Sequence, residues 1–372
     1  MRKTIYKSIF WGVILVFLSS RWWIVDAASA GFVRQPNPPA AQANLAGGVW
    51  QDISDRLPPQ PTGVQTIYRV VVKGASVWAA EHTTDIIYRS IDSGATFTAV
   101  HTGLTNLFEL IFFDELNGVA ISGIKFTHTS DGGLTWSTPV TVGPTLYAAD
   151  FASSLVGYAG GGNGIFYRTA DGGTIWEKKN FPFNSSIYDF EFPDPSAPNS
   201  GYLVVANAIT SLYKTTDGGT TWNYVTLPGI TSSMNALEFV SPDLGWAAGG
   251  DGEIFCLKDG AWTEQVSNAP LNQFNDPVSL MNGPFLPDGL TGWVVGYSGT
   301  ILHTTNGGQT WVQQGQNLNL PSLSNLVGVA AVSPTLAFAS GYPAISQGDS
   351  RRLFVYHTPD YNNYIFLPLL RR

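Results

Sequence analysis

The sequence predicts an all-β fold: a seven-bladed β-propeller of four-stranded antiparallel blades, closed by an N-terminal strand that completes the last blade. Three observations support this prediction. An eight-residue phrase, clearest as TTDGGTTW at residues 215–222, recurs along the chain. Four short strands fit between one copy and the next. A strand-like segment near the start of the chain resembles the one strand that the last unit lacks.

The repeated phrase sets the period of the chain. Near copies stand at residues 90–97, 129–136, 169–176 and 304–311, and a shortened copy stands at 258–262. Each contains one Asp or Asn residue, and these follow one another roughly every 40 positions. They are Asp92, Asp131, Asp171, Asp217, Asp259 and Asn306. Such a period is typical of a repeat protein in which each unit buries its apolar face against its neighbours.

The residue types in the phrase predict a tight hairpin turn. We expect the Asp or Asn side chain to accept hydrogen bonds from backbone N–H groups two residues further on, while the glycine pair supplies positive φ without a Cβ clash. The hydroxyl residue two places earlier adds a second side-chain bond, and the final aromatic residue opens the return strand as an apolar plug. Each turn would join the third and fourth strands of one unit.

The strands before each phrase follow a common order. Aromatic-rich alternating runs such as 188–192 and 237–240 come first, and runs with a Gly-aromatic start such as 244–249 follow. A seventh unit near the C-terminus has three strands and no phrase. Residues 48–53, which include Trp50, resemble the strand that follows each turn. We expect them to complete that unit and to cover an otherwise open sheet edge.

Residues 1–30 have the layout of a secretory signal peptide. Basic residues precede an apolar run at 9–18, and Ala-Ser-Ala at 28–30 offers a cleavage site. We expect cleavage after Ala30, and the long interval before it leaves an uncleaved anchor as the alternative. Cleavage would leave no membrane span, with the protein secreted, on the cell surface or in the periplasm.

The remaining segments complete the predicted organisation. Residues 31–47 read as a flexible linker and residues 48–357 as the propeller. Residues 358–372 end in an apolar stretch and two arginines, too short to span a bilayer. This tail is interpreted either as a sorting or surface-attachment signal, or as an extra edge strand or frayed end.

Composition excludes several function classes. The net charge is −8 with only 12% charged residues and no basic stripe, which argues against a nucleic-acid partner. Cys256 is the one cysteine, so no intramolecular disulfide can form, and its strand position predicts a buried, inert thiol. The five histidines have no zinc-binding spacing, and we assign no metal ligand among them.

The phrase resembles the Asp-box of the bacterial neuraminidase repeats. Together with Gly245-Trp246 and Gly292-Trp293, it makes the chain most similar to the photosystem II assembly and stability factor-like propellers. The resemblance implies that the box residues, from Asp92 to Asn306, are structural and lie on outer turns. It also implies a non-enzymatic role in holding a partner during assembly. Two-domain xyloglucan-cleaving propellers are similar too, but they need a second ring that this length cannot supply.

One constellation of side chains is a candidate site. Alignment of the innermost strands on their aromatic residues places Asp150, Glu191 and Glu238 at one equivalent position in three successive units. Glu109 and Asp189 lie two residues earlier, on the same face. Because innermost strands line the central channel, we expect an acidic cluster there that binds a cationic ligand or Ca²⁺. The alternative is that these carboxylates bond backbone N–H groups at strand ends or keep the rim hydrated.

Two function classes follow from these observations. The first is an exported, non-catalytic propeller that binds a protein or glycan partner, and for it we assign no catalytic residue and no cofactor. The second is a sialidase-like glycoside hydrolase acting on extracellular glycans through a pair of channel carboxylates. The three arginines and the Tyr–Glu pair that sialidases use are not visible in the sequence, which favours the first class.

Overall fold

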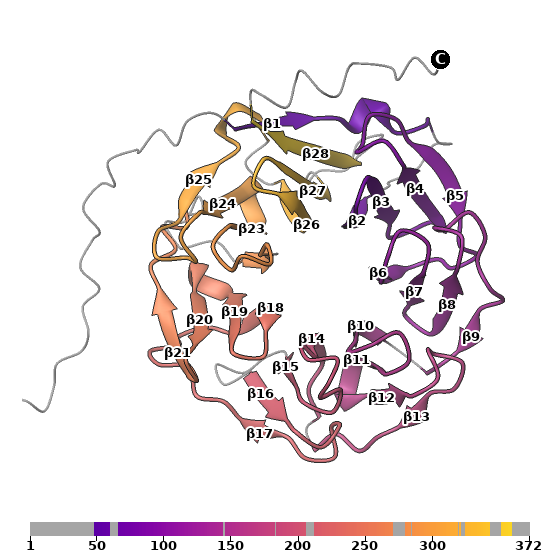
Figure 1. Ribbon diagram of the computed structural model, residues 1–372, viewed down its shortest axis with the longest axis vertical. Helices are drawn as coiled ribbons and strands as arrows, with labels where there is room; N and C mark the ends of the chain where they lie inside the picture. The colour runs from indigo at the N-terminus through magenta and orange to yellow at the C-terminus, as the bar shows by residue number, and fades with distance from the viewer. Residues whose placement is uncertain are drawn as a thin grey trace, which may run out of the picture. The chain divides into compact units, whose positions relative to one another are not determined.

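The propeller ring is the part of the chain that the computed structural model describes. The described residues are 48–59, 66–143, 146–182, 184–205, 212–270, 280–283, 285–318, 320, 324–342 and 351–358. They form seven four-stranded antiparallel sheets, as the sequence predicts. Figure 1 shows the seven sheets arranged radially in a ring. The predicted signal peptide, linker and C-terminal tail lie outside the described residues, apart from position 358.

Each blade runs from an innermost to an outermost strand. The first three blades are β2 (Ile67–Lys73), β3 (Ser76–Glu81), β4 (Ile86–Ser90) and β5 (Thr98–His101); β6 (Leu107–Phe112), β7 (Gly118–Ser122), β8 (Lys125–Thr129) and β9 (Val140–Thr141); and β10 (Leu146–Phe151), β11 (Gly157–Gly161), β12 (Phe166–Thr169) and β13 (Glu177–Lys178). The next three are β14 (Ile187–Glu191), β15 (Gly201–Val205), β16 (Leu212–Thr215) and β17 (Asn223–Tyr224); β18 (Met234–Ser241), β19 (Leu244–Gly249), β20 (Ile254–Lys258) and β21 (Ala261–Gln265); and β22 (Leu280–Asn282), β23 (Gly292–Gly296), β24 (Thr300–Thr304) and β25 (Val312–Gln314). Short 3₁₀ turns are η1 (Ser54–Arg56), η2 (Gly162–Gly164), η3 (Gly250–Gly252), η4 (Tyr297–Gly299) and η5 (Gln316–Leu318).

The seventh blade joins the two ends of the ring. It consists of β26 (Asn325–Ser333), β27 (Leu336–Tyr342) and β28 (Arg352–His357), with β1 (Val49–Asp52) as its outermost strand. β1 lies beside β28 (Figure 1) and pairs with it antiparallel. Trp50 lies opposite Tyr356. Trp50 is 1% exposed, and its Nε1 donates to Gln314 Oε1 of the sixth blade at 2.9 Å. The predicted closure by the Trp50 segment is therefore confirmed.

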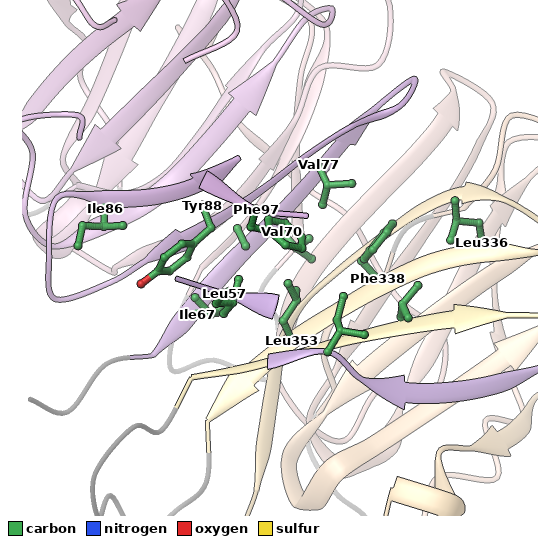
Figure 2. Packing of buried hydrophobic residues seen from close by; sticks show 13 residues of the cluster. Leu57, Ile67, Val70, Val77, Ile86, Tyr88, Phe97, Leu336, Phe338 and Leu353 are labelled. Carbon is green, nitrogen blue, oxygen red and sulfur yellow. The ribbon is translucent and has the colours of Figure 1, made fainter. Parts of the chain in front are cut away.

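Apolar side chains fill the spaces between neighbouring blades. Figure 2 shows the cluster between the seventh and first blades, where Phe338 and Leu353 lie beside Val70 and Phe97. These side chains alternate along their strands, so one face of each sheet packs on the blade before it and the other on the blade after it. Each blade therefore buries its apolar surface only by contact with two neighbours.

A glycine followed by an aromatic residue at the start of the second strand explains part of the packing between blades. A Cβ on Gly245 would lie 2.4 Å from the Phe239 ring, so only glycine lets that ring pack flat against the strand. The next residue on the second strand then stacks on the corresponding phenylalanine of the following blade. The stacked pairs, with centroid separations of 3.4–4.6 Å, are Trp78–Phe112, Tyr158–Phe192, Tyr202–Phe239 and Trp246–Phe285.

The predicted turns join the third and fourth strands through a shared hydrogen-bond pattern. At the first copy, Asp92 accepts from Ser90 Oγ at 2.6 Å and from the backbone N–H and hydroxyl of Thr96 at 2.9 and 2.6 Å. The Ser90 hydroxyl oxygen accepts the N–H of Gly94. The sequence predicts that the Asp side chain accepts the backbone N–H two residues further on, and this prediction is wrong. The acceptor reaches four residues on because the intervening residues at positive φ fold the loop back over the carboxylate.

The same pattern holds at Asp131, Asp171, Asp217 and Asn306, whose side-chain oxygens each accept the N–H four residues on at 2.9–3.0 Å. The shortened copy differs. Asp259 and Gly260 both have positive φ, 52° and 78°, between the paired residues Lys258 and Ala261. This is a two-residue hairpin loop whose backbone twist matches the strands, so the loop forms without a carboxylate bridge.

Candidate functional site

The five predicted carboxyl groups lie together in the central channel. Glu109, Asp150, Asp189, Glu191 and Glu238 all line one cavity of about 200 Å³. They come from the innermost strands β6, β10, β14 and β18 of four successive blades. The period of two along each strand turns them to the channel side, and the ring then brings the four strands to one sector. Residues of β2 and β26 complete the lining, so the cavity extends across the channel.

Glu109 is paired with an arginine that the sequence analysis did not single out. Arg69 on β2 donates through Nε to Glu109 Oε1 at 3.1 Å and through Nη2 to Oε2 at 3.2 Å. The two side chains are 20% and 14% exposed, so this bidentate contact is largely shielded from solvent. Arg69 and Glu109 occupy the same position on adjacent innermost strands. Their alignment could have suggested the pair.

Three of the other carboxyl groups bond the backbone of the next blade. Asp150 Oδ2 accepts the N–H of Phe192 at 2.7 Å, and Asp189 Oδ2 accepts the N–H of Leu237 at 2.8 Å. Glu238 accepts a backbone hydrogen bond from Phe285. These contacts agree with the alternative interpretation of the acidic cluster, in which the carboxyl groups accept hydrogen bonds from backbone N–H groups at strand ends. They also tie blades three, four, five and six together along the channel wall.

The channel shifts the protonation of these groups. Burial raises the pKa of Asp150 to about 6, of Asp189 to about 7 and of Glu238 to about 8. The backbone N–H donors oppose this shift because they stabilise the charged form. Burial, with the charges of Asp150 and Glu238, also raises the pKa of Glu191 well above its usual value. Near neutral pH, the carboxyl groups of the cluster are therefore partly protonated and share these protons. A cation that displaces the protons would increase the negative charge of the cluster.

A second cavity, of about 450 Å³, adjoins the first and is lined by aromatic rings. Tyr68, Phe108, Tyr147, Tyr188 and Tyr297 surround it, and we call these five residues the aromatic collar. Arg69, Tyr188 and Asn235 line both cavities, so the two are continuous. The collar was not predicted from the sequence, although four of its members are each the second residue of an innermost strand: Tyr68, Phe108, Tyr147 and Tyr188.

The collar depends on an irregularity that recurs around the ring. In every innermost strand, pairing with the second strand shifts register near the start of the strand, at the second residue in six strands and at the third residue in β26. Such a bulge breaks the strict alternation of side chains. Tyr188 and Asp189 are successive residues, yet both line the channel, as do Tyr68 and Arg69. A pattern of period two does not predict this arrangement.

The remaining predictions concern metals, the thiol and membrane segments. Among the described residues, no group of three or more His, Cys, Asp or Glu side chains is placed to hold a metal ion, so the acidic cluster offers Ca²⁺ no such ligand set. Cys256 is buried, as predicted, and burial raises the pKa of its thiol to about 11. Within the described part of the chain, no helix has the length and apolar character to cross a bilayer.

Comparison with solved structures identifies similar folds. YCF48 bound to D1 peptide matches with 18% identity and a TM-score of 0.58, over 82% of this chain and 97% of that one. YCF48 from Cyanidioschyzon merolae matches with 13% identity and a TM-score of 0.62, over 84% and 99%. The GH74 xyloglucanase from Xanthomonas campestris matches with 15% identity and a TM-score of 0.61, over 79% of this chain and 52% of the enzyme.

Identities at this level show a shared fold and nothing finer. No protein-family profile matches the sequence, and no curated protein sequence matches it. The similarity to a YCF48 propeller agrees with the resemblance drawn from the sequence. The chain spans about half the length of the xyloglucanase that it matches.

Proposed function

We propose that this protein is an exported, non-catalytic propeller that binds a protein partner at its central channel and acts as a binding or assembly scaffold. One observation carries the proposal. The channel carboxyl groups are engaged in hydrogen bonds that connect blades: Glu109 with Arg69, and Asp150, Asp189 and Glu238 with the backbone of the following blade. Such groups form a fixed wall around an open, aromatic-lined cavity, which suits recognition.

The comparison supports a peptide or protein as the partner. The YCF48 propeller with a similar fold is bound to D1 peptide. Aromatic and arginine side chains, which line the larger cavity here, are also the residue types enriched at protein interfaces.

The second function class, a glycoside hydrolase, makes different demands. It needs one carboxylic acid and one carboxylate that flank a sugar and are free to exchange protons with it. Here four of the five carboxyl groups have protein partners, and changing them would disturb contacts between blades. The similarity to the GH74 fold makes a direct assay worthwhile. Release of reducing sugar from xyloglucan or sialyllactose would contradict the proposal.

The proposal is tested by capture from the native envelope. The tagged full-length protein is cross-linked in its own cells, and cross-linked peptides are identified by mass spectrometry. We expect cross-links from the channel face to one reproducible protein, lost when excess untagged propeller is added. A glycan array with the same protein separates the partner classes: glycan binding without a cross-linked protein would overturn the proposal. N-terminal sequencing tests export, with a mature chain beginning at Gly31 as the expected result.

A further inference from the structure

The aromatic collar and the acidic cavity form one continuous recess with two chemical zones. The outer zone presents the rings of Tyr68, Phe108, Tyr147, Tyr188 and Tyr297, and the inner zone presents carboxyl groups. Tyr188 and Tyr297 are 42% and 41% exposed, so they are accessible at the entrance. Tyr68 lines the same cavity as these two residues, so the three rings surround one opening.

Ring contacts keep part of the collar in place. The Phe108 ring lies 5.5 Å from that of Tyr147 and 6.2 Å from that of Tyr68 in an edge-to-face arrangement. His82 packs against both Tyr68 and Phe108, at 5.0 and 4.8 Å, and its Nδ1 lies 2.9 Å from the carbonyl oxygen of Leu107. A collar held by such contacts loses little conformational freedom when a ligand enters.

The charge of the recess selects the ligand. Five carboxyl groups and one guanidinium line the inner zone, and that guanidinium, Arg69, is already paired with Glu109. An anionic group would meet net negative charge there. A cation would be attracted both by the carboxylates and by the faces of the aromatic rings. Glu191 adds a carboxyl group from the strand that also carries Tyr188 at the entrance.

The depth of the recess is comparable to the length of a long side chain. Tyr188 and Glu191 are three residues apart on β14, so the collar and the inner carboxyl group are separated by about 10 Å along the strand. A peptide backbone resting on the rings would therefore place a lysine or arginine side chain between the two zones. We propose that the recess is a binding site for the lysine or arginine side chain of a protein partner, with the collar around its apolar stem and the carboxylates facing its charge. This inference rests on the proposed function and specifies the chemistry of the partner.

The test uses a probe that differs from its control by charge alone. The probe is the capped peptide acetyl-Gly-Arg-Gly-amide, and its control contains citrulline, which has nearly the same shape and no charge. Binding to the intact protein is measured by calorimetry and by chemical-shift changes of the peptide. We expect the arginine peptide to bind at least about tenfold more tightly than the citrulline peptide. Equal affinities, or binding of neither peptide, would overturn the inference.

Matched variants localise the binding. Tyr188→Ala removes a collar ring, and Tyr224→Ala removes an equally exposed ring on outermost strand β17, 44% exposed. Glu191→Gln neutralises an inner carboxyl group, and Asp251→Asn makes the same change at an exposed turn. We expect the Tyr188 and Glu191 variants to lose most of their affinity for the arginine peptide and the two controls to keep it. Equal losses in a variant and its control would contradict the assignment.

Folding of each variant is checked by thermal unfolding. If Tyr188→Ala does not fold, Tyr188→Leu serves in its place, because it keeps an apolar side chain but removes the ring face. The inference and the proposed function fail in different ways. If a captured partner still binds the Tyr188 and Glu191 variants, the inference is wrong while the scaffold function stands. If the protein captures no partner, the proposed function is wrong.

Discussion

At the scale of single residues, the same side-chain type has different roles in different places. The carboxylate of Asp92 lies on an exposed turn and closes a loop through bonds to Ser90 and Thr96. The carboxyl group of Asp189 lies in the channel and accepts the N–H groups of Phe190 and Leu237. Hydrogen bonds keep the pKa of Asp92 low despite partial burial, whereas burial keeps that of Asp189 high. Environment therefore decides what each acid does.

Replacing the carboxylate of the first repeated turn tests its role in stability. Asp92→Ala removes three side-chain hydrogen bonds and should lower the free energy of unfolding by about 1 kcal/mol. Asp92→Asn should cost less. Asn306 shows why: its side-chain oxygen accepts the N–H of Thr310 at 2.9 Å, in the same geometry. Urea unfolding of the three proteins measures the difference, and equal losses for Ala and Asn would refute this account of the turn.

The channel carboxyl groups predict how stability depends on pH. Their pKa values are raised in the folded protein, to about 6, 7 and 8 for Asp150, Asp189 and Glu238, so the folded state holds protons that the unfolded chain releases. Their stabilising effect is complete below the unfolded pKa of about 4 and is lost as pH rises towards 8. We expect the free energy of unfolding to fall by more than about 1 kcal/mol over that range.

A neutral variant provides the comparison for this pH effect. Glu238→Gln cannot ionise, so its unfolding free energy should decline less steeply between pH 4 and pH 8 than that of the parent protein. Asp251→Asn, at an exposed turn, should leave the slope unchanged. Unfolding curves at several pH values give these slopes. A parent protein that becomes more stable as pH rises would contradict the predicted protonation of the channel.

At the scale of strands, two local features position the side chains of the core and of the channel. In the fourth, fifth and sixth blades, the Gly-aromatic start of the second strand lets a phenylalanine of the same blade lie flat, with an aromatic ring of the preceding blade stacked over it. The bulge near the start of each innermost strand turns successive side chains towards the channel, as at Tyr188 and Asp189. The first feature builds the core between blades, and the second builds the recess.

The glycine requirement can be tested directly. Gly245→Ala would bring a Cβ to 2.4 Å from the Phe239 ring, which packs against Tyr202 and Trp262 and has little room to move. We expect a loss of about 1 to 3 kcal/mol in unfolding free energy from this overpacking. Gly123→Ala is the matched control, because its Cβ would lie at an ordinary 3.6 Å from Phe108. Similar stabilities for the two variants, measured by urea unfolding, would refute the steric explanation.

At the scale of the whole molecule, the ring is held by its closure. β1 lies at the N-terminal end of the described chain and β28 at its C-terminal end, and they share one sheet. A buried ion pair supports the neighbouring junction: Arg351 Nη1 lies 3.8 Å from Glu81 Oε1, and both side chains are almost fully enclosed. Pairing between segments so far apart in the sequence forms slowly, and it closes the ring by joining both ends of the described chain in one blade.

Loss of the closing side chain should open this junction. Trp50→Ala removes a buried indole, its bond to Gln314 and its contact with Tyr356, and should cost about 3 to 5 kcal/mol. Val49→Ala, at a position 46% exposed on the same strand, should have little effect. Hydrogen exchange should show the largest loss of protection in β28, which becomes an exposed edge. Uniform loss across all blades would argue against local opening.

The sequence by itself determined the features that depend on neighbours along the chain. Gly and Asp chemistry at a fixed spacing specified the turns, a strand-like period of two specified the blades, and Trp50 marked the closing strand. It also placed the five carboxyl groups on one channel, since alternation along a strand fixes which side a residue faces. These properties are local, so they can be read from residue order.

Only the tertiary structure decided what those carboxyl groups contact. Asp150 meets the N–H of Phe192 because the third and fourth blades lie side by side at a particular height, which no spacing in the sequence expresses. The collar arises because bulges override the alternation that the sequence pattern assumes. Burial in the closed ring then raises the pKa values of the acids. Desolvation depends on every surrounding blade at once and exists only in the folded molecule.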